Sequence, residues 1–135
     1  MKPISPGVAG EARIKVTEDT LASKMGSGAV EVFSTPNLVL LMEEAAVNAL
    51  KPYLEEGETT VGSLVNIRHL APTPPGFEVT ARAILAEIDG RRLVFKVEAN
   101  DGVDKVGEGT HERHLVNHAK FISKAREKST RRKQI

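Results

Sequence analysis

One long helical pattern followed by a run of alternating segments is the feature that most constrains this fold. Residues 34–46, STPNLVLLMEEAA, open as a helix should. The Thr35 hydroxyl suits an N-cap, and Pro36 suits the first helical position, where a missing N–H leaves nothing unpaired. We expect the helix to run from Pro36 to about Tyr53 and to end before Gly57.

After this helix the hydrophobic period changes to the alternation that is typical of strands. The alternating segments are residues 60–70, 77–88, 92–99 and 103–116. Asp-Gly pairs separate the last three segments and favour tight antiparallel hairpins, and the proline-rich residues 72–76 interrupt the sheet between the first two. A weaker segment, residues 11–16, is expected to join an edge. The pattern predicts an α+β fold in which an antiparallel four-strand meander wraps around one long central helix.

Length and charge indicate one domain with a basic tail. A chain of 135 residues is large enough to bury a single core, and we assign residues 1–119 to one domain. Residues 120–135 hold seven of the 19 basic residues and only one of the 18 acidic ones. We expect this tail to be a solvated helix or to fray. With no interleaved aromatic residue beyond Phe121, it matches no nucleic-acid recognition motif, so nucleic-acid binding is the disfavoured interpretation.

The sequence also limits the compartment and the chemistry. No apolar run approaches the roughly 20 residues that a membrane helix requires, and the first ten residues lack the pattern of a signal peptide. We therefore expect a cytoplasmic protein without membrane contact. The absence of cysteine excludes disulfides and thiolate catalysis.

Two adjacent carboxylates on the helix face different surroundings. The apolar stripe that should contact the sheet consists of Leu38, Leu41, Met42, Ala45 and Ala49. Glu44 falls on the opposite, solvated side. Glu43 lies on a shoulder with apolar neighbours and has no basic residue one turn away, so it should lose hydration, as a general base or nucleophile does. The alternatives are that this shoulder is simply wet, or that Glu43 caps something structural.

The histidines offer two further candidates. In the segment 60–70, Ser63, Val65, Ile67 and His69 should share one face, which places His69 among apolar side chains. Such a histidine is either a satisfied core residue or a catalyst. The other three histidines, His111, His114 and His118, have spacings that suit a metal on a helix, but on a strand His111 and His114 face opposite ways. We expect no metal site.

Three stretches resemble one known family. STPNLVLLMEEAA, VGSLVNIRHLAPTPPGFEV and DGVDKVGEGTHERHLV are similar in order and spacing to the fluoroacetyl-CoA thioesterases and their relatives. The resemblance covers roughly residues 30–125. It implies the hotdog fold, an antiparallel sheet wrapped around one long helix, which is the architecture expected above.

The resemblance also implies a set of site residues. The family's catalytic threonine, glutamate and histidine match Thr35, Glu43 and His69. Two residues that border its acyl pocket match Gly62 and Arg113. The family's aromatic lid is longer than residues 17–33 of this chain, whose only aromatic residue, Phe33, is expected to border the substrate.

The implied activity is hydrolysis of a short-chain acyl-CoA, fluoroacetyl-CoA or a similar thioester. Glu43 would attack the carbonyl or activate water, His69 would move protons, and Thr35 would donate a hydrogen bond. No cofactor is expected, and coenzyme A enters only as part of the substrate. Hotdog sites commonly form between subunits, which implies a homodimer or a tetramer of two dimers. The alternative is a non-catalytic hotdog module that binds acyl-CoA or a related ligand.

Overall fold

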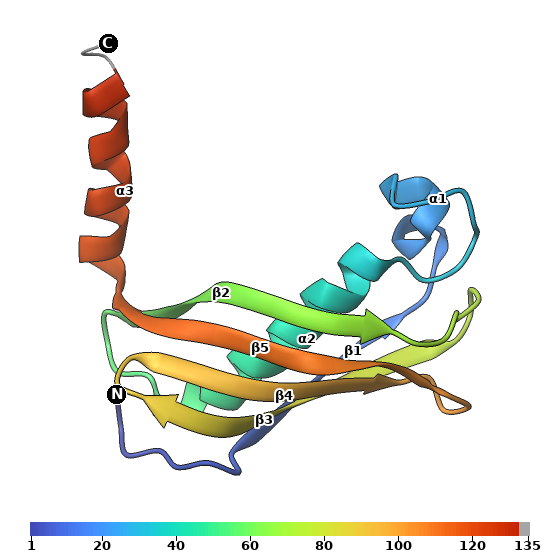
Figure 1. Cartoon of the computed structure of the whole chain (residues 1–135), viewed down its shortest axis with the longest axis horizontal. Helices are drawn as coiled ribbons and strands as arrows, with labels where there is room; N and C mark the ends of the chain where they lie inside the picture. The colour runs from blue at the N-terminus through green and yellow to red at the C-terminus, as the bar shows by residue number, and fades with distance from the viewer. Residues whose placement is uncertain (133–135) are drawn as a thin grey trace.

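The computed structural model describes residues 1–132, which form one curled antiparallel sheet and three helices (Figure 1). The strands are β1 (Ala9–Lys15), β2 (Glu58–His69), β3 (Glu78–Asp89), β4 (Arg92–Asn100) and β5 (Lys105–Asn117). The helices are α1 (Ala22–Met25), α2 (Thr35–Leu50) and α3 (His118–Arg132), with short 3-10 turns at Glu18–Thr20 and Lys51–Tyr53.

The order of the strands is β1-β3-β4-β5-β2. The predicted antiparallel sheet around one long helix is confirmed, and so is the early strand at an edge, since β1 pairs with β3. The predicted four-strand meander is wrong at its first member. Only β3, β4 and β5 form a meander, whereas β2 lies at the far edge and pairs with β5. Proline residues cannot donate to a strand ladder, and the proline-rich segment after β2 carries the chain from one edge region of the sheet to the other.

Helix α2 packs against the face of the sheet that curls around it (Figure 1). All five residues of the predicted apolar stripe are buried, together with Ala46 and Leu50. Small residues allow this helix to approach the sheet closely. A Cβ atom at Gly10 of β1 would collide with the backbone of Ala45 and Ala49, so α2 and β1 are in backbone contact there.

The end of α2 comes three residues before the predicted one. Pro52 has no N–H to donate to the carbonyl four residues earlier, and the chain tightens into the 3-10 turn Lys51–Tyr53. Gly57 then takes a φ of 81°, a left-handed conformation that suits glycine, before β2 begins.

Helix α3 stands away from the sheet and buries none of its residues (Figure 1). It begins at His118, two residues before the predicted start of the tail at Lys120, and the last three tail residues, 133–135, lie outside the described part of the chain. Among residues 1–132, no helix is both long and apolar enough to cross a membrane.

A buried hydrogen-bond cluster ties three loops together near the start of α2. The Thr73 hydroxyl donates to Asp101 Oδ2 at 2.8 Å, and the N–H groups of Val103 and Asp104 donate to Asp101 Oδ1. The Thr73 carbonyl accepts from the Phe33 N–H. Burial raises the pKa of Asp101, but the hydrogen bonds from Asp104, Val103 and Thr73 outweigh it and hold the pKa below its ordinary 3.8.

We expect Asp101→Asn to lower the free energy of unfolding at pH 7 by about 2 kcal/mol, because a charged acceptor is lost. A lowered folded-state pKa stabilises the fold above the unfolded pKa, and this contribution disappears as pH falls through the folded-state pKa. In urea unfolding, the difference between wild type and variant should therefore shrink as pH falls below the ordinary 3.8 and through the lower pKa of the folded state. Asp104→Asn, at an exposed position, is the control, and a difference that stays constant with pH would contradict the assignment.

Candidate active site

The first turn of α2 is capped by a different hydroxyl from the one predicted. Ser34 is the N-cap, with an extended backbone and an Oγ that accepts from the Asn37 N–H at 3.2 Å and from Asn37 Nδ2 at 2.7 Å. Thr35 is already helical, so the prediction that it caps the helix is wrong. Its hydroxyl is available for another partner.

That partner is His69, the last residue of β2. Thr35 Oγ1 and His69 Nδ1 are 2.7 Å apart, a hydrogen bond between the start of α2 and the end of the edge strand. The two residues are 34 positions apart in sequence, and each was predicted as a site residue from a different stretch. The structure brings them into direct contact.

The second ring nitrogen of His69 is in an unusual situation. His69 Nε2 is buried and has no hydrogen-bond partner among the described residues. Burial lowers the pKa of His69 below its ordinary 6.5, while the backbone of Ala71 acts in the opposite direction. The imidazole is therefore neutral at pH 7, the form in which it exchanges protons with a substrate or water.

An open groove of about 380 Å³ lies beside this pair. Thr35 and His69 line it, with Phe33 and the segment Leu70–Pro72. Phe33 is almost fully buried, so the ring forms part of the groove wall and also of the core. The groove gives a ligand access to the hydroxyl and the imidazole.

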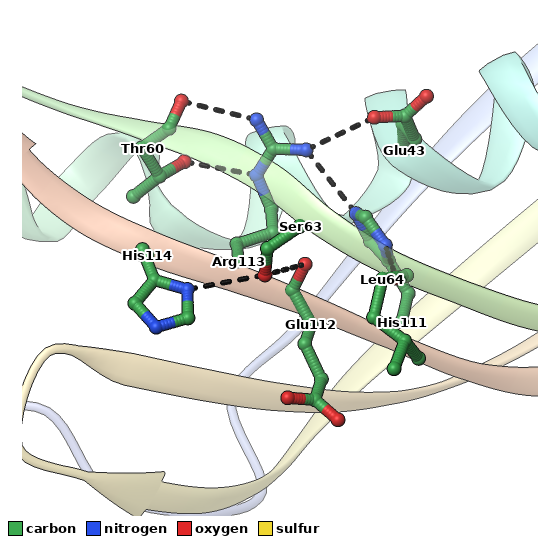
Figure 2. Close-up of polar contacts among 8 residues, drawn as sticks. All are labelled: Glu43, Thr60, Ser63, Leu64, His111, Glu112, Arg113 and His114. Atoms are coloured by element: carbon green, nitrogen blue, oxygen red, sulfur yellow. Dashed lines mark hydrogen bonds and ion pairs between the residues drawn. The ribbon is translucent and has the colours of Figure 1, made fainter.

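Glu43 lies in a second polar cluster, on α2 two turns after Thr35. Its Oε2 is 3.4 Å from Arg113 Nη1 of β5 (Figure 2). The Glu43 side chain is 35% exposed and that of Arg113 only 7%. Helix α2 offers no basic residue one turn from Glu43, as the sequence indicated, but a strand distant in sequence supplies a cation. Glu44 is exposed, as predicted.

Arg113 is held on several sides by β2 and β5 (Figure 2). Its Nε donates to Thr60 Oγ1 at 2.9 Å and its Nη2 to the Thr60 carbonyl at 3.1 Å. Its Nη1, which faces Glu43, is also 3.1 Å from His111 Nε2. Sequence reasoning did not assign Thr60 or His111 to the site, although the alternation of His111 and Arg113 along β5 placed both on one face.

Gly62 is required where β2 passes this cluster. A Cβ atom there would lie 2.7 Å from Glu43 Oε2 and 3.2 Å from Arg113 Nη1. The register between β2 and β5 shifts directly after Gly62, which leaves Ser63 as the extra residue of a β-bulge. Ser63 therefore does not share the face of Val65 as predicted, and its hydroxyl instead contacts His114 on the other face of the sheet (Figure 2).

The resemblance seen in the sequence implies that Glu43 takes part in thioester hydrolysis. On that expectation, Gly62→Ala should lower kcat/KM about a hundredfold, because the new methyl group displaces the Glu43 carboxylate, and small displacements of reacting groups have effects of this size. The clash is with the end of a flexible side chain, so the melting temperature should change little. Thiol release and thermal unfolding measure the two effects. Unchanged turnover would mean that the position of Glu43 does not matter.

The two polar clusters remain separate within one chain. Thr35 and Glu43 are eight residues apart on α2, a rise of about 12 Å along the helix axis. Among residues 1–132, no hydrogen bond joins Glu43 to Thr35 or His69. The chain therefore unites two of the three residues predicted as catalytic and places the third with Arg113 and Gly62.

The remaining histidines do not converge on a common point. His111 is buried on the α2 side, His114 contacts Ser63 on the opposite side (Figure 2), and His118 is exposed at the start of α3. Within the described range, no group of three or more His, Cys, Asp or Glu residues is arranged to hold a metal.

Comparison with known proteins agrees with the resemblance seen in the sequence. Residues 16–119 match the profile of a family described as fluoroacetyl-CoA-specific thioesterase. A fluoroacetyl-CoA thioesterase of Streptantibioticus cattleyicolor is 50% identical over 99 residues, 73% of this chain and 71% of that protein.

Solved structures are similar over nearly the whole chain. The structure of the fluoroacetyl-CoA thioesterase FlK matches with a TM-score of 0.87 and 38% identity, over 94% of this chain and 98% of that one. A hypothetical protein of Thermus thermophilus, described as a thioesterase superfamily member, matches over the full length of both chains with a TM-score of 0.92 and 32% identity. With its hotdog architecture and this agreement in sequence, the chain belongs to the fluoroacetyl-CoA-specific thioesterase family.

Proposed function

We propose that this protein hydrolyses the thioester of a short-chain acyl-CoA, and that Thr35, Glu43 and His69 carry the reaction. The observation that carries the proposal is the Thr35–His69 hydrogen bond at an open groove, with a buried histidine Nε2 that has no hydrogen-bond partner within residues 1–132. The similarity to enzymes named fluoroacetyl-CoA thioesterases supports the class of substrate.

Glu43 acts on the thioester by one of two routes, either as a nucleophile or as a general base. In the covalent route, its carboxylate attacks the carbonyl carbon, the C–S bond breaks, coenzyme A leaves as the thiol after protonation, and water hydrolyses the acyl anhydride. In the general-base route, Glu43 takes a proton from water as the water oxygen attacks the carbonyl carbon; the C–S bond of the tetrahedral intermediate then breaks, and coenzyme A leaves as the thiol after protonation. Both routes end with a free carboxylic acid and free coenzyme A.

His69 and Thr35 act at the other side of the scissile bond. A neutral imidazole takes up and returns a proton during the reaction, and its depressed pKa keeps it neutral under ordinary conditions. The Thr35 hydroxyl fixes the orientation of the ring through Nδ1. Arg113 and Gly62 contribute at the Glu43 side, where the guanidinium holds the carboxylate and the missing side chain of Gly62 leaves space for it.

In a homodimer, the Thr35–His69 pair of one chain and the Glu43–Arg113 pair of the other come together. Strand β2 is a 12-residue edge strand, and its Leu64 and Val65 are 42% and 39% exposed. Unprotected edges of this length pair readily with another strand. In a twofold antiparallel pairing, the His69 end of each β2 lies alongside the stretch 60–62 of the partner copy, which borders the partner's Glu43. Each site would then combine Thr35 and His69 of one chain with Glu43 of the other.

The test is release of free thiol from a panel of short acyl-CoAs, fluoroacetyl-CoA and acetyl-CoA among them, with acyl-CoA binding measured by calorimetry in parallel. We expect turnover, and the best substrate defines the acyl class. Binding without turnover of any member would support the alternative, a non-catalytic module. A cytoplasmic location and assembly into a tetramer stay predictions beside this proposal.

A further inference from the structure

His111 is a buried titratable group to which the proposed chemistry gives no role. Its exposed fraction is 1%. It lies on β5 opposite Val65 of β2, just after the β-bulge, and its ring is on the same side of the sheet as Arg113 and Glu43 (Figure 2).

Two neighbours fix which ring nitrogen of His111 carries the proton. Nδ1 is 2.8 Å from the Leu64 carbonyl oxygen, which can only accept a hydrogen bond, so Nδ1 must be the donor. Nε2 is 3.1 Å from Arg113 Nη1, which can only donate, so Nε2 must be the acceptor. The only form of the ring that satisfies both contacts is the neutral one with its hydrogen on Nδ1.

This arrangement determines where Arg113 points. Thr60 holds the Nε and Nη2 sides of the guanidinium. The remaining nitrogen, Nη1, is shared between His111 Nε2 and Glu43 Oε2. A planar guanidinium bonded along all three of its nitrogens cannot rotate without breaking a contact, so His111 fixes the direction in which Nη1 meets the carboxylate.

We propose that His111 is a positioning residue, which accepts a hydrogen bond from Arg113 and thereby holds the guanidinium in the orientation that places the Glu43 carboxylate for reaction. The inference rests on the proposed role of Glu43 in thioester hydrolysis. His111 itself touches neither the substrate nor the reacting atoms in this account.

Protonation of His111 would break the hydrogen bond that its Nε2 accepts from Arg113. A charged ring has no acceptor at Nε2 and sets a second cation beside Arg113. Burial lowers the pKa of His111, the Leu64 carbonyl raises it, Arg113 lowers it, and the carboxylates of Glu43 on α2 and Glu112 on β5 raise it. The balance lies below the ordinary 6.5, so the accepting form is present at pH 7.

The experiment compares His111→Leu, which has no acceptor, with His111→Gln, whose amide oxygen accepts from Arg113 but does not gain a proton. His114→Leu, on the opposite face of the same strand, is the matched control. In thiol release from the preferred acyl-CoA, we expect His111→Leu to lower kcat by about 10- to 100-fold with KM changed less than about threefold, as for loss of one hydrogen bond to a charged group. His111→Gln should recover most of this loss, and His114→Leu should behave as wild type.

A second measurement does not depend on folding of the variants. Nitrogen NMR of the wild-type histidines at pH 7 should show His111 neutral, with its hydrogen on Nδ1. A hydrogen on Nε2, or equal turnover by wild type and His111→Leu, would overturn the inference while leaving the proposed function in place. Absence of turnover by the wild type would instead defeat the proposed function, and this inference with it.

Discussion

Glu43→Gln is expected to lower kcat by about a thousandfold, the scale on which a general base or nucleophile contributes. Glutamine has nearly the same shape as glutamate and still accepts a hydrogen bond from Arg113, so the local packing should survive. The amide can neither attack the thioester carbonyl nor take a proton from water. The loss is measured as the rate of thiol release from the preferred acyl-CoA.

The neighbouring glutamate provides the control for this prediction. Glu44 lies on the same helix, one residue later, but its side chain is exposed. Glu44→Gln should therefore keep the wild-type kcat. Loss of activity in Glu44→Gln, or its retention in Glu43→Gln, would mean that the two carboxylates have been assigned the wrong way round.

Mixing two inactive variants is expected to restore activity. If each site draws His69 from one chain and Glu43 from its partner, a mixed dimer of Glu43→Gln and His69→Ala chains has one site with both changes and one site with neither. After random exchange of subunits, about a quarter of the wild-type sites should be intact, since half of the dimers are mixed and each has one good site.

The mixing experiment needs subunit exchange, which refolding of the combined chains from urea provides. Each variant refolded alone is the control and should remain inactive. Turnover near a quarter of the wild-type value would support the shared site and the pairing of two β2 strands. No recovery in a mixture that contains mixed dimers would mean that all catalytic groups of one site come from one chain.

Local sequence patterns predicted the secondary-structure elements of this fold well. Because these patterns relate only residues close in sequence, they missed the contacts between distant segments. Helical and alternating periods depend on residues a few positions apart, so they located α2, its buried stripe and the strands. The pairing of β2 with β5 joins segments that are distant in sequence. Periodicity carries no information about such a partner, and the proline-rich segment after β2 indicated only that the chain turns there.

The candidate site shows the same limit in its individual residues. Ser34 and Thr35 both carry a hydroxyl suited to capping, and only the backbone conformation decides which one caps. Glu43 was judged from its own helix, which offers no cation, whereas Arg113 reaches it from β5, 70 residues away. The bulge at Ser63 reversed the face of one residue in an otherwise correct alternation.

The resemblance supplied what the patterns did not, because it named residues on different elements as one site. The structure joins Thr35 to His69 and Glu43 to Arg113, but it does not join these pairs within one chain. The contacts of His111 and Thr60 with Arg113 were not predicted, because they join residues whose own sequence neighbourhoods do not indicate them.

The central claim is that Glu43 and His69 act together in cleaving a thioester. It is tested most directly by thiol release from the preferred acyl-CoA by wild type, Glu43→Gln, His69→Ala and the double variant, each shown by circular dichroism to be folded. Residues that act as a unit lose their contribution together, so the account predicts that both single variants are severely impaired and that the double variant is no slower than the worse of them. Wild-type turnover in either single variant, or losses that multiply in the double variant, would contradict it.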